Sequence, residues 1–232
     1  MSKIAVVFDL DDTLYSERNY VFSGFQAVSV YLNKTTGYDA VVVYERLTAA
    51  FVRNVRGCTF NIVLDELGLV PNEEQIRDLV EVYRSHMPVL GLYPDAKCTI
   101  ERLRPYAKLG LLTDGFVESQ RKKVQSLGIE SWFDQIVYTD DIGHDFWKPS
   151  PVPFQRISRQ LKVNPERSVY VGDNPDKDFI GARGIGMKTV RVVRPDTEHG
   201  HKTPGFGYEA DHEVNTLGEV PEYISGCFSI PI

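Results

Sequence analysis

Five short apolar runs are spread along the chain, and each of them is rich in Val, Ile, Leu or Tyr. They are Ile4–Phe8, Lys108–Leu112, Gln135–Tyr138, Ser168–Val171 and Lys188–Val193. A run in which nearly every position is apolar is typical of a strand buried on both faces, whereas a strand with one wet face alternates. The five runs therefore predict the strands of a buried parallel sheet.

Helical patterns separate these runs in the second part of the chain. The predicted helices are Pro94–Leu103, Val117–Leu127, Pro151–Leu161 and Pro175–Gly184. Strands that alternate with helices indicate a parallel sheet, because a parallel pair needs a long crossover connection. We therefore expect an α/β fold, with a Rossmann-like parallel sheet core and helices on both faces.

The stretch 16–88 breaks this alternation, because it contains helical patterns and no convincing strand. The patterns lie around Tyr20–Leu32, Ala40–Val55, Phe60–Leu67 and Glu73–His86. Glycines and a proline separate them. The segment Ala40–Tyr44, with three consecutive valines, could form a strand on propensity alone. We expect residues 16–88 to form a helical insert in a core made of 1–15 and 89–232.

Composition narrows the class of protein. The chain has 232 residues, of which 42% are hydrophobic and 25% charged, with a formal net charge of −6. The acidic balance argues against a nucleic-acid partner, and the cluster Arg121-Lys122-Lys123 is expected on the solvated face of a helix. Three scattered cysteines predict neither disulfides nor a zinc site. Without a secretory leader or an apolar run near 18 residues, we expect a cytoplasmic protein with no membrane segment.

Polar side chains follow four of the predicted strands, at the edge where parallel sheets bind ligands. They are Asp9 and Asp11 after the first strand, Thr113 and Asp114 after the second, Lys148 beyond the third, and Asp173, Asn174 and Asp178 after the fourth. Because these strand ends meet at one edge of the sheet, we expect the side chains to lie close together.

Crowded carboxylates need a cation. Two of them about 4 Å apart repel by about 4 kcal/mol at an effective dielectric constant near 20. Mg²⁺ prefers oxygen ligands and commonly takes one or two carboxylates together with phosphate and water. A lysine and a hydroxyl suit the oxygens of the phosphate. The pattern therefore predicts a Mg²⁺ ion and a phosphoryl group at this edge.

Four short motifs stand at the same strand ends in a familiar order. "DLDDT", "LLTDG", "KPSP" and "GDNPDKD" resemble the four motifs of the haloacid dehalogenase-like hydrolase superfamily, over about Ile4 to Val193. The helical insert resembles the α-helical cap of one branch, which sets substrate specificity. The resemblance implies a Mg²⁺-dependent phosphatase that hydrolyses a small phosphorylated metabolite.

The resemblance also implies a role for each site residue. Asp9 would be the nucleophile that forms an aspartyl-phosphate, and Asp11 the general acid and base. Crowding by other acids is expected to raise the pKa of Asp11. The metal ligands would be Asp9, Asp173 and the backbone carbonyl of Asp11. Phosphate would contact Thr113, the Asp114 amide and Lys148. Asp178 and Asn174 would lie behind these groups without contacting phosphate, and Asp178 would orient Lys148 or a metal-bound water.

Two other activities remain open at this point. A sugar phosphomutase would use the same Asp9 and Asp11 pair and return the phosphoryl group to a sugar. A 2-haloacid dehalogenase is disfavoured, because the dehalogenases of the family lack an acid two residues after the nucleophile. The substrate is not readable from the sequence, although Arg53 and Arg56 are candidates to meet a second anionic group. Caps of this type sometimes pair, which leaves a homodimer open.

Overall fold

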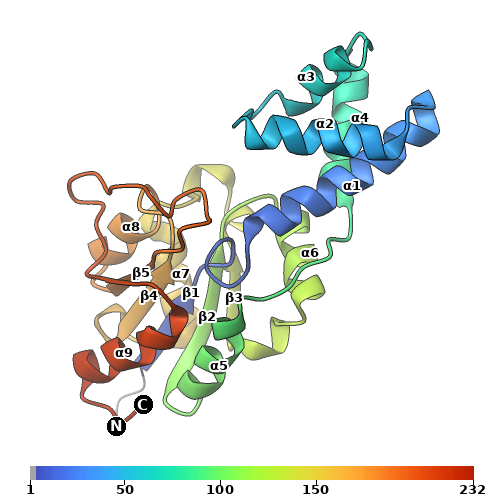
Figure 1. The fold of residues 1–232 in the computed structure, drawn as a ribbon. Helices are drawn as coiled ribbons and strands as arrows, with labels where there is room; N and C mark the ends of the chain where they lie inside the picture. Colours follow the sequence, from blue (N-terminus) through green and yellow to red (C-terminus); the bar gives the residue numbers. More distant parts are fainter. Residues whose placement is uncertain (1–3) are drawn as a thin grey trace. The chain divides into compact units, whose positions relative to one another are not determined.

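The computed structural model describes residues 4–232, which form two compact units (Figure 1). The sheet unit consists of the segment that ends at Glu17 together with Leu90–Ile232, and the helical unit is Arg18–Val89. The expected insert, 16–88, lies within two residues of these limits. The candidate chemistry falls in the sheet unit.

A parallel sheet of six strands forms the centre of the sheet unit, in the order β3-β2-β1-β4-β5-β6. The strands are β1 Ile4–Phe8, β2 Ala107–Thr113, β3 Gln135–Tyr138, β4 Ser168–Gly172, β5 Lys188–Val192 and β6 His212–Val214. All five residues of β1 are buried, and Val7 pairs with Gly110 on one side and Tyr170 on the other. The predicted α/β, Rossmann-like fold is therefore confirmed.

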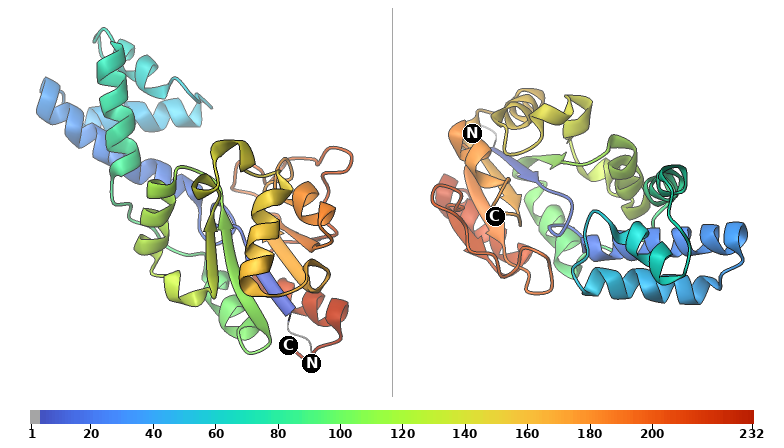
Figure 2. Two further views of the ribbon diagram at one scale, coloured as in Figure 1. Left: turned by 180° about the vertical axis from the view of Figure 1, so that it is seen from behind. Right: turned by 90° about the horizontal axis from the view of Figure 1, so that it is seen from above.

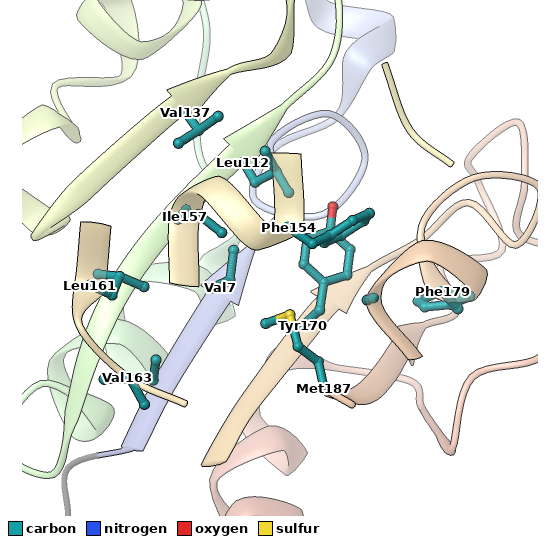
Figure 3. Packing of buried hydrophobic residues seen from close by; sticks show 12 residues of the cluster. Val7, Leu112, Val137, Phe154, Ile157, Leu161, Val163, Tyr170, Phe179 and Met187 are labelled. Atoms are coloured by element: carbon teal, nitrogen blue, oxygen red, sulfur yellow. The ribbon is translucent and has the colours of Figure 1, made fainter. Parts of the chain in front are cut away.

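Helices cover the two faces of the sheet, with α5 and α9 on one face and α7 and α8 on the other (Figures 1 and 2). The helices of this unit are α5 Pro94–Leu103, α6 Val117–Leu127, α7 Pro151–Leu161, α8 Phe179–Gly184 and α9 Val220–Phe228. Figure 3 shows Phe154, Ile157 and Leu161 of α7 packed toward the sheet. Each such side chain contributes about 1.5–3 kcal/mol on burial.

The structure departs from the predicted elements in three places. Helix α8 begins at Phe179 and not at Pro175, because the residues from Asn174 to Asp178 form a hydrogen-bonded turn. Strand β6 was not predicted. Only Val214 of its three residues is buried, so the strand has no apolar run. Helix α9 was also missed.

The helical unit contains α1 Glu17–Thr36, which begins one residue before the unit, α2 Ala40–Val52, α3 Thr59–Glu66 and α4 Glu73–Ser85. The segment Ala40–Tyr44 is helical. The Asp39 side chain accepts the Val41 N–H at 2.7 Å, which starts the helix, and Val43 and Leu47 are buried with helical spacing. Within residues 4–232, no helix has both the length and the apolar character that crossing a membrane requires.

Candidate active site

The expected site residues meet at the carboxyl-terminal ends of β1, β2 and β4. Asp9 follows β1 directly, Thr113 ends β2, and Asp173 follows β4, so the ladder of the sheet fixes their separation. The backbone N–H of Asp9 donates to Val171 O at 2.8 Å. These three side chains are almost fully buried, as are Lys148 and Asp178. The strand-end argument therefore placed these residues correctly.

Lys148 joins two carboxylates in the buried centre of the site. Its ammonium Nζ donates to Asp9 Oδ1 at 2.8 Å, to Asp178 Oδ1 at 2.7 Å and to the Tyr170 hydroxyl at 2.9 Å. Burial alone would lower the pKa of Lys148, but Asp178 and Asp9 raise it well above its ordinary value. Burial alone would raise the pKa of Asp178, but the positive charge of Lys148 outweighs burial and the pKa is lowered. Lys148 and Asp178 therefore form a charged buried pair.

Three carboxylates form a candidate cation site. One oxygen each from Asp9, Asp173 and Asp178 lies within 4.8 Å of the others. Asp173 Oδ2 is buried and has no hydrogen-bond partner within the described residues. Burial raises the pKa of Asp9 to about 7, and burial together with Asp178 and Asp9 raises that of Asp173 well above normal. A hard divalent cation such as Mg²⁺ fits these oxygen donors and would relieve their repulsion.

The Asp11 carboxylate has a separate set of partners. Lys123 Nζ donates to Oδ1 at 2.7 Å, Gln120 Nε2 donates to Oδ2 at 2.8 Å, and the Tyr15 hydroxyl donates to Oδ1. Burial raises the pKa of Asp11, but the charge and hydrogen bond of Lys123 outweigh burial, and the pKa is lowered. The expected rise was therefore wrong, because the sequence did not reveal the ammonium.

Lys123 was expected on the solvated face of α6, and this prediction was wrong. Its side chain is 5% exposed and lies against Asp11, whereas Arg121 is 58% exposed and pairs with Asp141. Gln120 and Lys123 are three positions apart and share one side of the helix. Val124 is buried next to them. This spacing was the available signal that Lys123 points inward.

Thr113 and Asp114 surround the site from the end of β2. Thr113 Oγ1 accepts from Gln120 Nε2 at 2.5 Å. The Asp114 carboxylate accepts the Lys148 backbone N–H at 3.2 Å and the Thr139 hydroxyl at 2.8 Å. The Asp114 amide was expected to contact phosphate, and no role was predicted for its carboxylate. In the structure the carboxylate links the loop that carries Lys148 to the end of β2 by a hydrogen bond.

The turn after β4 positions Asp178. The Asn174 backbone N–H donates to Asp178 Oδ2 at 2.9 Å, and the Asn174 side chain accepts the Asp176 N–H at 3.0 Å. A Cβ atom on Gly172 would lie 2.5 Å from Asp178 Oδ2, so only glycine leaves room for this carboxylate. Both oxygens of Asp178 are thus held by protein donors, which leaves Asp9 and Asp173 as the carboxylates open to a cation.

Sequence reasoning missed four of the contacting side chains: Tyr170, Lys177, Gln120 and Lys123. Tyr170 lies inside a fully buried strand, where an aromatic residue is ordinarily core. Lys177 stands in a variable position of the turn, and its ammonium lies 3.3 Å from Asp114 Oδ2. The two candidate specificity arginines have local partners, Arg53 with Glu66 and Arg56 with backbone carbonyls.

Comparison with known proteins gives consistent matches. The profile of the haloacid dehalogenase-like hydrolase family matches residues 6–192. A glyceraldehyde 3-phosphate phosphatase of Methanopyrus kandleri is 34% identical, over 82% of this chain and 84% of that protein. A phosphoserine phosphatase of Thermus thermophilus is 34% identical over 63% of this chain and 57% of its own length. The crystal structure of a HAD phosphatase from Thermococcus onnurineus aligns with a TM-score of 0.63 and 28% identity, covering 97% of this chain and 99% of that one.

Proposed function

This chain belongs to the haloacid dehalogenase-like hydrolases, and on that premise we propose that it is a Mg²⁺-dependent phosphatase of small phosphorylated metabolites. The observation that carries the proposal is the buried Asp9 carboxylate, held by Lys148 at 2.8 Å beside the unpartnered Oδ2 of Asp173. Phosphoryl transfer depends mainly on positioning and on stabilising charge. Two relatives with 34% identity are named phosphatases, which supports the same reaction class.

Asp9 and Asp173 are the side chains that would hold Mg²⁺. Their fit is supported by burial, by shared oxygen chemistry and by the raised pKa of each carboxyl in the absence of a compensating cation. When bound, the ion supplies positive charge that neutralises the carboxylates and polarises a phosphoryl oxygen. Asp178, whose two oxygens already accept from Lys148 and Asn174, supports Lys148.

In the first chemical step, the Asp9 carboxylate attacks phosphorus. A bond forms from its oxygen to phosphorus while the bond from phosphorus to the leaving oxygen breaks, and an aspartyl-phosphate results. Lys148 orients the nucleophile by holding Oδ1. The leaving oxygen takes a proton from Asp11, and the product alcohol departs. Asp11 has to carry that proton when the substrate is bound, and the negative charge of the incoming phosphoryl group favours the protonated form because it raises the pKa of the neighbouring carboxyl.

In the second step, water attacks the same phosphorus atom. The bond between phosphorus and the Asp9 oxygen breaks, phosphate is released, and the water gives its proton to Asp11. The proton that Asp11 donated in the first step is thereby regained. The contact with Lys123 stabilises the ionised Asp11 that this step needs, and Gln120 and Tyr15 hold its orientation.

The alternatives differ in what accepts the phosphoryl group or in the bond that breaks. A phosphomutase would return the group to a sugar phosphate. The two activities are therefore distinguished by whether water or a sugar phosphate accepts the phosphoryl group. A 2-haloacid dehalogenase would release halide without a metal. The partly buried Asp11 carboxylate with its three donors counts against that reaction, because such an organised acid and base group suits an oxygen leaving group.

We further propose that the helical unit sets the choice of metabolite, as the family resemblance implies. The relative from Methanopyrus kandleri is named for glyceraldehyde 3-phosphate, so three-carbon phosphates belong in the first panel. Sugar phosphates, nucleotides, phosphoserine and phosphoglycolate complete it. Exchange of Arg53 or Arg56 for Met should change the ranking of substrates in that panel if either meets a second anionic group.

The test of the proposed function compares p-nitrophenyl phosphate hydrolysis by the wild-type protein and Asp9→Asn. We expect Mg²⁺-dependent turnover that EDTA abolishes and added Mg²⁺ restores, and a loss of at least about 1,000-fold in Asp9→Asn. Asp65→Asn, an exposed aspartate in the helical unit, is the matched control and should keep full activity. Turnover by Asp9→Asn at the wild-type rate would overturn the proposal.

A further inference from the structure

The donors of Lys148 are fully used within the protein. A lysine ammonium has three N–H donors, and those of Lys148 go to Asp9, Tyr170 and Asp178 at 2.7–2.9 Å. Its side chain has no exposed surface. A phosphoryl dianion that entered the site would have to displace one of these buried partners to gain a bond from Lys148. In this arrangement Lys148 serves the carboxylates, and a cation other than Lys148 would add to what the metal gives the phosphoryl group.

Lys177 is placed to supply that cation. It precedes Asp178 in the turn between β4 and α8, and its Nζ lies 3.3 Å from Asp114 Oδ2. Its side chain is 31% exposed, so solvent or a ligand reaches it. Its positive charge also lowers the pKa of Asp9 and of Asp173, the two carboxylates that would hold the metal.

Lys123, Arg191 and Arg194 are other cationic side chains near the site, and each donates hydrogen bonds to groups of the protein. Lys123 is 5% exposed and bound to Asp11. Arg191 is buried and donates to the backbone oxygens of Asp173, His199 and Lys202 and to Glu213. Arg194 donates to Asp95 and to a backbone oxygen. Of these four described cations, Lys177 has the most exposed side chain, at 31%, and Asp114 is its acidic partner.

We propose that Lys177 binds the phosphoryl group of the substrate, and that Asp114 holds its ammonium over the site until the phosphate arrives. The inference rests on the proposed phosphatase function and assigns a binding residue that the motif pattern leaves as a variable position. A phosphate dianion competes well for an ammonium that is partly exposed and has one carboxylate contact, at 3.3 Å. Lys148 then remains the positioning residue for Asp9, and the two lysines have separate tasks.

The test is the affinity for inorganic phosphate in the presence of Mg²⁺, measured by isothermal titration calorimetry. Lys177→Met should weaken binding by at least about 10-fold, because it removes one charge-assisted contact. Lys177→Arg, which keeps the charge, should stay within about threefold of wild type. Lys188→Met is the matched control, since Lys188 is exposed and opens β5 at the opposite edge of the sheet. Its affinity should equal that of wild type.

Steady-state kinetics with p-nitrophenyl phosphate provide the second readout, and Lys177→Met should lower kcat/KM by a similar factor. Unchanged phosphate affinity in Lys177→Met overturns the inference, and so does a wild-type protein that binds no phosphate at millimolar concentration with Mg²⁺. Failure of the phosphatase proposal is recognised separately, by full activity of Asp9→Asn or by no wild-type turnover. Thermal unfolding of each variant establishes that a loss of affinity is not a loss of fold.

Discussion

At the scale of single residues, the site is a set of buried carboxylates that differ in their partners. Lys148 contacts Asp178, and Lys123 contacts Asp11. Each contact lowers the pKa of the carboxyl and so favours its ionised form. Asp173 has no such lysine contact within the described residues, and its pKa is raised by burial. A buried charge without a partner is costly, whereas a pair with complete hydrogen bonding is tolerated. Asp173, whose Oδ2 has no hydrogen-bond partner within the described residues, is therefore well suited to bind a metal.

Lys123→Met tests the separate partners of Asp11. Without the ammonium, the pKa of Asp11 should rise, so the carboxylate that accepts the proton of water becomes protonated as the pH falls. We expect kcat to drop relative to wild type, with a loss about 10-fold greater at pH 5 than at pH 8. The free wild-type protein should keep Asp11 ionised at both pH values, because Lys123 holds the pKa of this carboxyl below its ordinary value.

Arg121→Met is the control for Lys123→Met, because it removes a cation and an ion pair from the same helix at an exposed position. Its kcat should match wild type at both pH values. An equal loss at pH 5 and pH 8 in Lys123→Met would show that Lys123 acts only on the fold.

The sequence predicted the positions of the acids but not their protonation. Asp9, Asp11 and Asp173 follow strands, and parallel register brings strand ends together whatever the side chains are. Lys123 belongs to a run of three basic residues, where composition favours solvent, and only its register with Gln120 separates it from Arg121. Since pKa values depend on such contacts, the raised pKa expected for Asp11 could not be corrected from the sequence.

At the scale of elements, close packing of α8 against the loop before α7 positions Lys148. A Cβ atom on Gly181 would lie 2.3 Å from the Pro149 carbonyl oxygen and 2.9 Å from the Phe154 ring. The carbonyl belongs to the residue directly after Lys148 and cannot rotate away as a flexible side chain could. The small residue in α8 is therefore required by the approach of the loop.

Gly181→Ala should destabilise the protein by about 1–3 kcal/mol, because the backbone at Pro149 has to move. It should also lower kcat, because Lys148 moves with it. Gly184→Ala is the matched control in the same helix, since nothing lies within 4 Å of the added Cβ atom. Urea unfolding and p-nitrophenyl phosphate turnover measure both effects. A Gly181→Ala protein as stable and active as Gly184→Ala would contradict this packing argument.

The elements that were predicted have strong periodic patterns, and those that were missed do not. Strands β1 and β3 agree with their predicted ranges residue for residue, and in β1 burial of all five residues demands apolar side chains throughout. Strand β6 is a three-residue edge strand with two exposed polar residues, so its pairing to β5 is a tertiary effect. The first half of the predicted α8 was lost to the Asn174 turn, whose function is to hold Asp178.

At the scale of the whole molecule, the strand order explains why the site lies where it does. The chain passes from β1 to β2 and β3 in one direction, and β4 then pairs on the other side of β1. Parallel sheets bind ligands at such a reversal, outside the carboxyl ends of the two strands. Asp9 and Asp173 follow β1 and β4, so the topology itself brings the two proposed metal ligands together.

This arrangement makes the stability of the metal-free protein depend on pH. The pKa of Asp9 is about 7 in the native state against 3.8 normally. The native state therefore binds more protons than the unfolded state between these values, and its stability falls as the pH rises through them. For one carboxyl the loss is about 4 kcal/mol. Asp12, whose pKa burial raises to about 6, adds to the loss.

Mg²⁺ should reverse this loss, because it binds the ionised carboxylates. We expect Mg²⁺ to raise the Tm more at pH 8 than at pH 5, measured by differential scanning fluorimetry against EDTA. Asp9→Asn should show a flatter dependence of Tm on pH without metal. An equal Mg²⁺ effect at both pH values would contradict the assigned pKa of Asp9.

The measurement that tests the central claim most directly is identification of the phosphorylated residue. The protein is mixed with p-nitrophenyl phosphate and Mg²⁺, quenched in acid within milliseconds to seconds, digested and analysed by mass spectrometry. We predict one phosphoryl group on the peptide that contains Asp9, present with Mg²⁺ and absent with EDTA or in Asp9→Asn. Phosphate release at the wild-type rate with no label on Asp9 at any quench time would contradict the account.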